Sequence, residues 1–267
     1  MNDDSRLAFL GATGLASLRS ARAVVVGTGG SGSHLVQQLA HLGVGETIAI
    51  DPDNLERSNV NRVVLSHYRV IGQPKAELIA HRLRKLARVQ PLVMRIEEAD
   101  SIQGLQSADI CFSAVDHFGT RHVIEYFARM ALVPVIDVGM QIRVEGEGDT
   151  RRVVSAGGQV VTSIPGEACF WCLGFLSDEL LARERNRYAG TQVDYEQQVI
   201  SVNGLLASQA ITNMLGLFAG FVGPSGVTRY TSYNALTGNM RSHPLLSGVD
   251  VNVCPHYPLK DAGWAVR

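Results

Sequence analysis

Short apolar runs alternate with amphipathic helical patterns through the first half of the chain. The runs of strand length are Ala23 to Gly27, Thr47 to Asp51, Val93 to Glu97, Asp109 to Val115 and Pro134 to Val138. Between them, apolar residues recur at helical spacing in His34 to Leu42, Lys75 to Arg88 and Thr120 to Leu132. Strands that alternate with helices form a parallel sheet with helices on both faces. We therefore predict an α/β fold with a doubly wound, Rossmann-like, mostly parallel sheet.

After Gly139 the pattern changes to one typical of an appended antiparallel part. The pattern predicts two hairpin strands, Gln141 to Val144 and Arg151 to Ser163, followed by a polar helix at Asp178 to Arg187. A loop at Thr191 to Gln198 then leads to a long apolar helix at Val199 to Val222, and a final pair of strands lies within Val227 to Met240. No stretch is rich in Pro, Ser or charge, as a linker would be. We therefore expect residues 1–267 to form one domain.

Composition excludes several classes of function. The 267 residues carry a net charge of -1, which gives no long-range field to attract nucleic acid or anionic lipid. Asn203, Gln209 and Asn213 interrupt the long apolar segment, which is expected to be a buried helix rather than a membrane span. The chain starts MNDDSRLAFL, acidic where a secretory signal needs basic residues. We predict a cytoplasmic protein that contacts neither nucleic acid nor membrane.

A glycine-rich turn between the first strand and the first helix is the most informative segment. Gly27, Gly29, Gly30 and Gly32 lie in the sequence AVVVGTGGSG, directly before the helical pattern. Such a turn cradles phosphate, because free N–H groups and the helix dipole favour an anion and glycine lets it approach. The second strand ends in Asp51, where a carboxylate can bind a ribose hydroxyl. Alone, this pattern also fits a nicotinamide or flavin dehydrogenase.

Polar residues follow Asp51 at spacings that a dehydrogenase does not need. They lie in the segments AIDPDNLERSNVNR and GQPK. With the glycine turn, they resemble the ThiF/MoeB/HesA superfamily of ubiquitin-activating-like bacterial adenylyltransferases, whose pattern is GxGGxG, DxDxxxxSNxxR and GxxK. The matching residues are Gly27 to Gly32, Asp51, Asp53, Ser58, Asn59, Arg62, Gly72 and Lys75. The resemblance runs from about Arg19 to Cys254, and in the second half it rests on PGEACFWC, LARE and VISVNGLLAS.

The resemblance implies an ATP-dependent adenylyltransferase. It implies that the glycines, Asp51, Asp53 and Asn59 bind the nucleotide, with Asp51 on the ribose, and that Asn59, Arg62 and Lys75 surround the phosphates. The implied substrate is the C-terminal carboxylate of a ubiquitin-like or sulfur-carrier protein, or of a peptide. That carboxylate would attack the α-phosphorus of ATP and release pyrophosphate.

Asp116, which closes the fourth strand in the sequence SAVDH, matches the family's magnesium-binding aspartate. A carboxylate at the carboxyl end of a parallel strand is also where open α/β sheets bind ligands. Each residue has a structural interpretation as well: Asp116 can cap the next helix, Lys75 can be a solvated first-turn lysine, and Arg62 can pair with Glu56. The joint spacing favours the nucleotide site.

The cysteines are Cys111, Cys169, Cys172 and Cys254. In a cytoplasmic chain, the C-x-x-C pair indicates half of a zinc site rather than a disulfide. The family has a second C-x-x-C, but residues 254–257 here read CPHY, so we predict a Cys₃His zinc site completed by His256. The alternative is a reduced pair left from a lost site. Cys111 lies in an apolar strand and is expected to be a core residue.

Two departures from the family concern mechanism and assembly. Leu173 to Asn252 contains no cysteine, so we expect an enzyme that stops at the acyl adenylate and forms no thioester. The family's R-x-x-R-Q pattern reaches across a dimer to the phosphates. In this chain only Arg6 lies in that region, without the Gln, and a tail arginine is the alternative.

We therefore expect a homodimer in which residues 1–140 bind the nucleotide and residues 141–267 provide cargo binding, zinc and the dimer contact. A conjugating enzyme is a candidate downstream partner. The alternatives are a catalytically silent subunit or scaffold of an activating complex, or an NAD-dependent oxidoreductase. Retention of Asp51, Arg62, Lys75 and Asp116 together argues against the silent subunit. The sequence does not identify the cargo.

Overall fold

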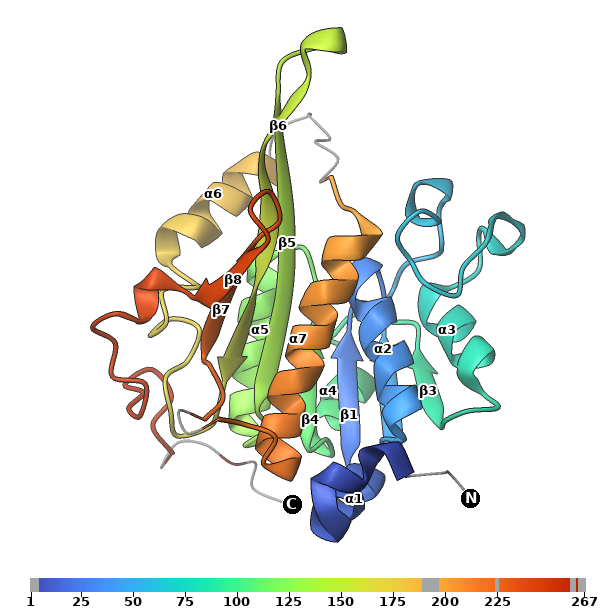
Figure 1. The fold of residues 1–267 in the computed structure, drawn as a ribbon, viewed down its shortest axis with the longest axis vertical. Coiled ribbons are helices and arrows are strands. Elements are labelled where there is room, and N and C mark those ends of the chain that lie inside the picture. Colours follow the sequence, from blue (N-terminus) through green and yellow to red (C-terminus); the bar gives the residue numbers. More distant parts are fainter. Residues whose placement is uncertain (1–4, 189–196, 224–225, 260–262, 264–267) are drawn as a thin grey trace.

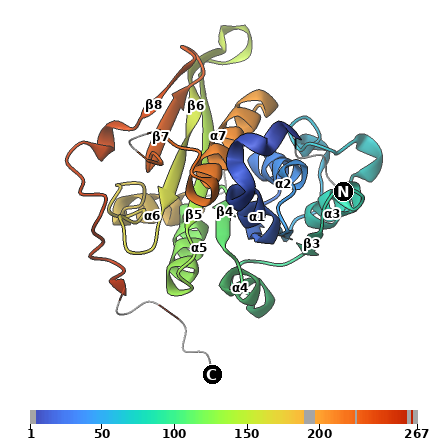
Figure 2. The same cartoon turned by 60° about the horizontal axis from the view of Figure 1, so that its bottom comes forward.

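A mixed eight-stranded sheet forms the centre of the protein, as the computed structural model in Figures 1 and 2 shows; it describes residues 5–188, 197–223, 226–259 and 263. The strand order is β3-β2-β1-β4-β5-β6-β7-β8. The strands are β1 (Arg22–Val26), β2 (Glu46–Ile50), β3 (Val89–Leu92), β4 (Ile110–Ser113), β5 (Val135–Glu145), β6 (Arg152–Ser163), β7 (Tyr230–Asn234) and β8 (Asn239–Ser242). Neighbours from β3 to β5 are parallel and those from β5 to β8 are antiparallel, which confirms the predicted fold class.

Helices cover both faces of the parallel part. They are α1 (Gly11–Ser20), α2 (Gly30–Leu42), α3 (Lys75–Leu83), α4 (Ala99–Gln106), α5 (Phe118–Met130), α6 (Asp178–Tyr188) and α7 (Ile200–Ala219), with a 3₁₀ helix at Ser5–Leu10. Helices α1, α2, α3 and α7 pack on one face, and α4 and α5 on the other, with α6 beside α5 (Figure 1). None of the described helices is long and apolar enough to cross a bilayer.

The sheet has a hydrophobic core on each face, which explains why the first strands are apolar along their whole length. In β1, Ala23 and Val25 point into the core beneath α2 and α7, whereas Val24 and Val26 point into the core beneath α5. Successive side chains of a strand alternate between faces, and here both faces are covered. A buried parallel strand is therefore apolar at every position.

Several boundaries differ from the predictions. The third strand is Val89–Leu92 rather than Val93 to Glu97, because this strand lies at the sheet edge, where it is half-exposed and tolerates a proline, so its pattern is weak. Helix α3 ends at Leu83, and the predicted remainder to Arg88 forms the turn that leads into β3. The 3₁₀ helix, α1 and α4 were not predicted. Of the predicted loop Thr191 to Gln198, residues 191–196 lie outside the described residues.

The topology brings the functional segments to one edge of the sheet. The carboxyl ends of β1, β2 and β4 lie together, and α1 lies at the opposite end of β1 (Figure 1). Strands β5 and β6 form a long hairpin that extends beyond the rest of the sheet. Helix α7 packs across β5, β6 and α2, and so joins the two halves of the chain.

Candidate active site and metal cluster

A cavity of about 390 Å³ lies at the carboxyl ends of the parallel strands. Nearly all the residues predicted to bind the nucleotide line it: Gly27, Gly29, Gly30, Asp51, Asp53, Asn59, Arg62, Lys75 and Asp116. Gly32 lies just outside the lining, within α2. The structure thus brings together segments that are up to 89 positions apart in the chain, from Gly27 to Asp116.

The glycine turn is too tight for side chains at two positions. Gly27 has φ +85°, and a Cβ there would lie 2.5 Å from the Ala114 carbonyl oxygen. A Cβ on Gly32 would lie 1.8 Å from the Gly27 carbonyl oxygen. Helix α2 therefore starts directly against the turn, and the N–H groups of its first turn are available to an anion in the cavity.

Asp51 fixes the glycine turn in place. Its buried carboxylate accepts hydrogen bonds from Thr28 N at 2.6 Å and Thr28 Oγ1 at 3.0 Å through Oδ2. Its Oδ1 accepts one from Asp53 N at 2.9 Å. A carboxylate oxygen can accept more than one hydrogen bond, so Oδ1 keeps capacity for a hydroxyl group. Asp51 can therefore brace the turn and contact a ribose at the same time.

The cationic groups beside the turn are held by the protein's own acceptors. Lys75, with a side chain only 11% exposed, places Nζ 2.9 Å from Asp53 Oδ2. Arg62 donates to the backbone carbonyl of Ser58 at 2.6 Å, so the structure does not support its predicted alternative pairing with Glu56. Lys75 is likewise not the solvated lysine of the alternative interpretation. Both cations line the cavity and can exchange these acceptors for phosphate oxygens.

Asp116 is exposed at the carboxyl end of β4. Its nearest polar partner is Gln198, whose Nε2 lies 3.5 Å from Oδ1, and it has no ion pair among the described residues. It is not a helix cap: Glu184 of α6 accepts the hydrogen bonds of Phe118 N and Gly119 N at the start of α5, both at 2.8 Å. An open, exposed carboxylate of this kind is suited to Mg²⁺.

Helix α7 completes the glycine turn, a contact that the sequence did not predict. Asn203 is 1% exposed and its Oδ1 accepts from Ser31 Oγ at 2.9 Å. Its Nδ2 donates to Gln198 at 3.4 Å and lies 2.2 Å from the position that a Cβ on Gly30 would take. Asn203 lies in the segment VISVNGLLAS, which is part of the resemblance described above.

Arg121, another residue missed by the sequence analysis, lines the cavity from α5. Its Nε donates to Asp137 Oδ2 at 3.0 Å, and Ser113 Oγ donates to the same oxygen at 2.5 Å. Burial raises the pKa of Asp137 above its usual value, while the neighbouring Arg121 guanidinium opposes this shift. Only the fold brings these residues together, so no short motif could have predicted the cluster.

Arg6 does not reach the cavity of its own chain. It is exposed on the 3₁₀ helix Ser5–Leu10, which leads directly into α1 at the far end of β1 (Figure 1). It is absent from the described residues that line the cavity. Its predicted role at the site of a neighbouring subunit stays a prediction.

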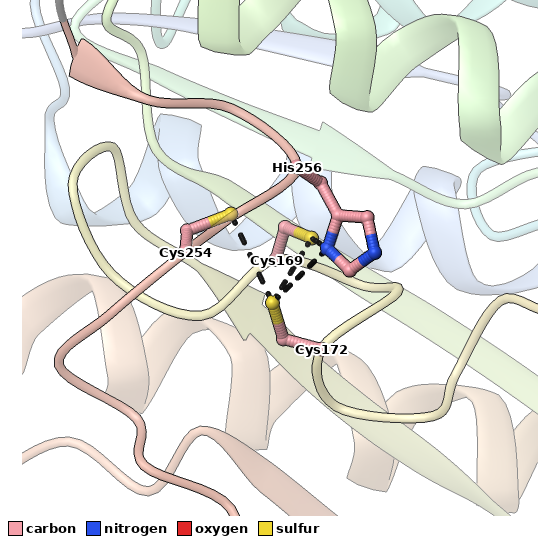
Figure 3. A group of neighbouring side chains, drawn as sticks. All are labelled: Cys169, Cys172, Cys254 and His256. Atoms are coloured by element: carbon pink, nitrogen blue, oxygen red, sulfur yellow. Dashed lines mark hydrogen bonds between the residues drawn. The ribbon is translucent and has the colours of Figure 1, made fainter.

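Cys169, Cys172, Cys254 and His256 converge in one cluster, as Figure 3 shows. The Sγ–Sγ distances are 3.6 Å for Cys169–Cys172 and 3.8 Å for Cys172–Cys254, and His256 Nδ1 lies 3.4 and 3.3 Å from the first two sulfurs. Tetrahedral zinc with Zn–S bonds of about 2.3 Å separates its sulfurs by about 3.8 Å. The four predicted residues therefore fit zinc, with His256 as the fourth ligand.

Buried charges of α5 anchor the loop that carries the first cysteines. Glu125 Oε1 accepts from Phe170 N at 2.7 Å and from Ser163 Oγ at 2.6 Å. Arg129 donates to the Glu167 carbonyl oxygen at 2.9 Å. Burial raises the pKa of Glu125 to about 7. Polar side chains of α5 thus hold the metal-cluster loop against the sheet.

The sequence is similar to those of known adenylyltransferases and E1-like enzymes. Molybdopterin-synthase adenylyltransferase of Escherichia coli is 27% identical over 244 residues, which cover 90% of each chain. SAMP-activating enzyme E1 of Haloferax volcanii is 33% identical over 167 residues, 61% of this chain and 57% of that protein. The chain therefore spans little more than half the length of the second relative. These names support the predicted enzyme class, an ATP-dependent adenylyltransferase.

The fold is similar to that of solved structures, and the sequence matches a protein family. Escherichia coli MccB, solved with MccA-N7isoASN, has a TM-score of 0.74 at 20% identity, covering 96% of this chain and 74% of MccB. At that identity the likeness concerns the fold alone. The ThiF family matches residues 2–254, nearly the whole chain, which confirms the resemblance predicted from the glycine turn and the residues that follow it. The chain belongs to the ThiF family.

Proposed function

We propose that this protein is an ATP-dependent adenylyltransferase that activates the C-terminal carboxylate of a ubiquitin-like or sulfur-carrier protein as an acyl adenylate. The observation that carries the proposal is one cavity in which the glycine turn, the cations Lys75 and Arg62 and the open carboxylate of Asp116 meet. The names of the relatives, which include a sulfur carrier protein adenylyltransferase of Thermus thermophilus, support this substrate class.

The chemistry requires two anions to react. An oxygen of the cargo carboxylate forms a bond to the α-phosphorus of ATP, and the bond from that phosphorus to pyrophosphate breaks. Lys75 and Arg62 would neutralise the phosphate charge, with Lys75 leaving Asp53 to do so. Electrostatic stabilisation of this kind is the largest contribution a site can make when the protein supplies no nucleophile.

The remaining residues of the cavity would hold the nucleotide. The N–H groups at the start of α2 would bind the phosphates, and Asp51 would bind the ribose through its less occupied oxygen. Asp53 and Asn59 complete the lining on this side. Asp116 would hold Mg²⁺, which would offset the charge that builds up on the reacting phosphate.

Zinc would have a structural role. All four positions of the cluster are protein ligands, which leaves no open position for a substrate. Burial raises the pKa values of the Cys169 and Cys172 thiols, so a bound metal would displace protons from them. The cluster would then hold residues 254–256 against the loop at Cys169.

The enzyme would pass on the adenylate without forming a thioester. The segment Leu173 to Asn252 contains no cysteine, and Cys111 is fully buried in β4. Burial raises the pKa of Cys111, which keeps this thiol protonated and unreactive. The other cysteines belong to the metal cluster.

The proposal extends to assembly and compartment. A homodimer would let Arg6 of one chain approach the site of its neighbour, and a conjugating enzyme would be a candidate acceptor of the adenylate. One domain would combine a nucleotide-binding part, residues 1–140, with a part for cargo and zinc, residues 141–267. The cysteines are free thiols, and three of them lie where they can bind a metal; this use of cysteine supports a cytoplasmic location.

Exchange of labelled pyrophosphate into ATP tests the activity. Purified protein is incubated with Mg-ATP and small ubiquitin-like or sulfur-carrier proteins from the same genome. We expect exchange with a carrier that ends in its natural C-terminal residue and none with the same carrier amidated at that terminus. Failure to bind ATP in calorimetry, or binding of NADH in its place, would contradict the proposal.

A further inference from the structure

Arg121 is a cation in the cavity to which the nucleotide-binding pattern gives no role. Only 5% of its surface is exposed, yet it lines the cavity beside Gly139 and Gln159. Lys75 and Arg62 come from the segment that follows β2, whereas Arg121 lies in α5. Of the described lining residues, Arg121 is the one arginine or lysine contributed by the elements from α5 to α7.

The guanidinium group of Arg121 is fixed from three directions. Its Nε donates to Asp137, which is fully buried and also accepts from Ser113. Its central carbon lies 5.0 Å from the centre of the Phe118 ring and 5.5 Å from that of Phe175. A planar cation packed on two rings and bound at one edge has little freedom to turn. Its other edge therefore has a defined direction.

That other edge has no protein acceptor. A guanidinium has five N–H donors, and among the described residues only Nε of Arg121 has an acceptor. The position that a Cβ on Gly139 would take lies 2.9 Å from Arg121 Nη2 and 3.0 Å from Gln159 Nε2. Two donors thus converge beside the bare backbone of β5, at the wall of the cavity. Nearly buried N–H groups of a cation favour an anionic or carbonyl oxygen as partner.

We propose that Arg121 binds the C-terminal carboxylate of the cargo, at the oxygen that does not attack ATP, with Gln159 as a second donor. This inference rests on the proposed function. During the reaction the attacking oxygen forms its bond to the α-phosphorus, and pyrophosphate leaves with the electrons of the broken bond. The second oxygen remains on Arg121 and becomes the carbonyl oxygen of the acyl adenylate. No proton is transferred.

In this assignment Arg121 is a catalytic residue, and Asp137 and Ser113 are positioning residues. Asp137 does not reach the substrate but sets the plane of the guanidinium group. Gly139 has a steric role, because only a residue without a Cβ leaves the space in which Arg121 and Gln159 approach each other. The cavity then has a nucleotide side at Lys75 and a carboxylate side at Arg121.

Two stable nucleotide analogues separate these sides. 5′-O-Sulfamoyladenosine occupies the nucleotide side alone, whereas its N-(acetylglycyl) derivative adds the carbonyl oxygen of an acyl adenylate. For Arg121→Met, we expect the affinity for the acyl derivative to fall by about 10- to 100-fold, as loss of a charged hydrogen bond does, with affinity for the parent compound changed less than about twofold. Calorimetry measures both.

Two further variants keep the test decisive if Arg121→Met does not fold. Gly139→Ala keeps the buried ion pair but places a methyl group against Arg121 Nη2, and Asp137→Asn keeps the shape of the positioning residue. Both should weaken binding of the acyl derivative by about 3- to 10-fold and leave the parent compound unaffected. A purely structural role predicts equal losses for the two compounds and would overturn the inference. Failure of wild type to bind either analogue would instead contradict the proposed function.

Discussion

The cavity at the strand ends and the Cys₃His cluster hold their polar groups together by different means. In the cavity, Asp51 is fixed by three hydrogen bonds at the ends of buried strands. In the cluster, the ligand pairs Cys169/Cys172 and Cys254/His256 lie in two segments without strands or long helices. The sheet therefore preforms the cavity, whereas we expect the cluster to depend on the ion that its residues fit.

This difference separates catalysis from stability. A change in the cavity should remove activity and leave the fold intact, because the sheet does not depend on the nucleotide. A change in the cluster should reduce stability and leave the nucleotide side largely unaffected. The connection between the two regions is α5, which carries Arg121 at the cavity and Glu125 beside the cluster.

The largest effect is expected for Asp116→Ala and Arg62→Ala. Each should lower pyrophosphate exchange by about 100- to 1,000-fold, because each removes a charge that the proposed mechanism places beside the transition state. Zinc content and melting temperature should stay at their wild-type values. Asp149→Ala and Arg84→Ala, at exposed positions away from the cavity, are matched controls. Full exchange by either site variant would remove that residue from the mechanism.

The zinc cluster should show the opposite behaviour. Carefully prepared protein is expected to hold about one zinc per chain by elemental analysis, as a single tetrahedral site requires. Cys169→Ser should abolish zinc binding and lower the free energy of unfolding by about 3–5 kcal/mol, more than Cys111→Ser does. ATP affinity should change little.

Well under one zinc per chain in wild type would contradict the assignment of the cluster. A loss of ATP affinity in Cys169→Ser as large as the loss of stability would break the separation between the two regions.

A smaller, pH-dependent effect is expected at Glu125. Its folded-state pKa is raised from 4.5 to about 7, so its contribution to stability is fully present below pH 4.5 and is lost as pH rises through 7. Relative to Glu125→Gln, wild type should lose about 3 kcal/mol of unfolding free energy over this range. Chemical unfolding at several pH values measures the difference. A difference independent of pH would show that Glu125 ionises normally in the folded state.

The last prediction is that no effect is seen: the enzyme should form no covalent thioester with its cargo. Incubation with ATP and cargo, followed by a non-reducing gel, should give no thiol-labile adduct, because Cys111 is buried and the other cysteines belong to the cluster proposed to hold zinc. An adduct that disappears in one cysteine variant would overturn this expectation and identify the nucleophile.

Nearly all the residues predicted to bind the nucleotide line one cavity because they lie in short motifs at the ends of β1, β2 and β4 or in the segment that follows β2. Strand ends of a parallel sheet meet at one edge, so local order implies spatial proximity. Arg121, Glu184 and Asn203 were missed because their roles depend on helices docking from elsewhere in the chain. The edge strand β3 was misplaced since half-exposed strands lack a strong apolar pattern. The four residues of the Cys₃His cluster were predicted from the C-x-x-C pair and from the C-x-H that replaces the family's second pair.

The contact between Asn203 and Ser31 has a consequence for the order of folding during synthesis. These residues are 172 positions apart, yet their hydrogen bond packs α7 against the start of α2. The ribosome releases the glycine turn long before it has made the helix that completes it. A nascent chain that ends at residue 140 would expose the apolar surface that α7 later covers, including Leu35 and Val138. We therefore expect the cavity to fold completely only after the last third of the chain has emerged from the ribosome. From that point the apolar surface is buried and is no longer accessible to a quality-control protease.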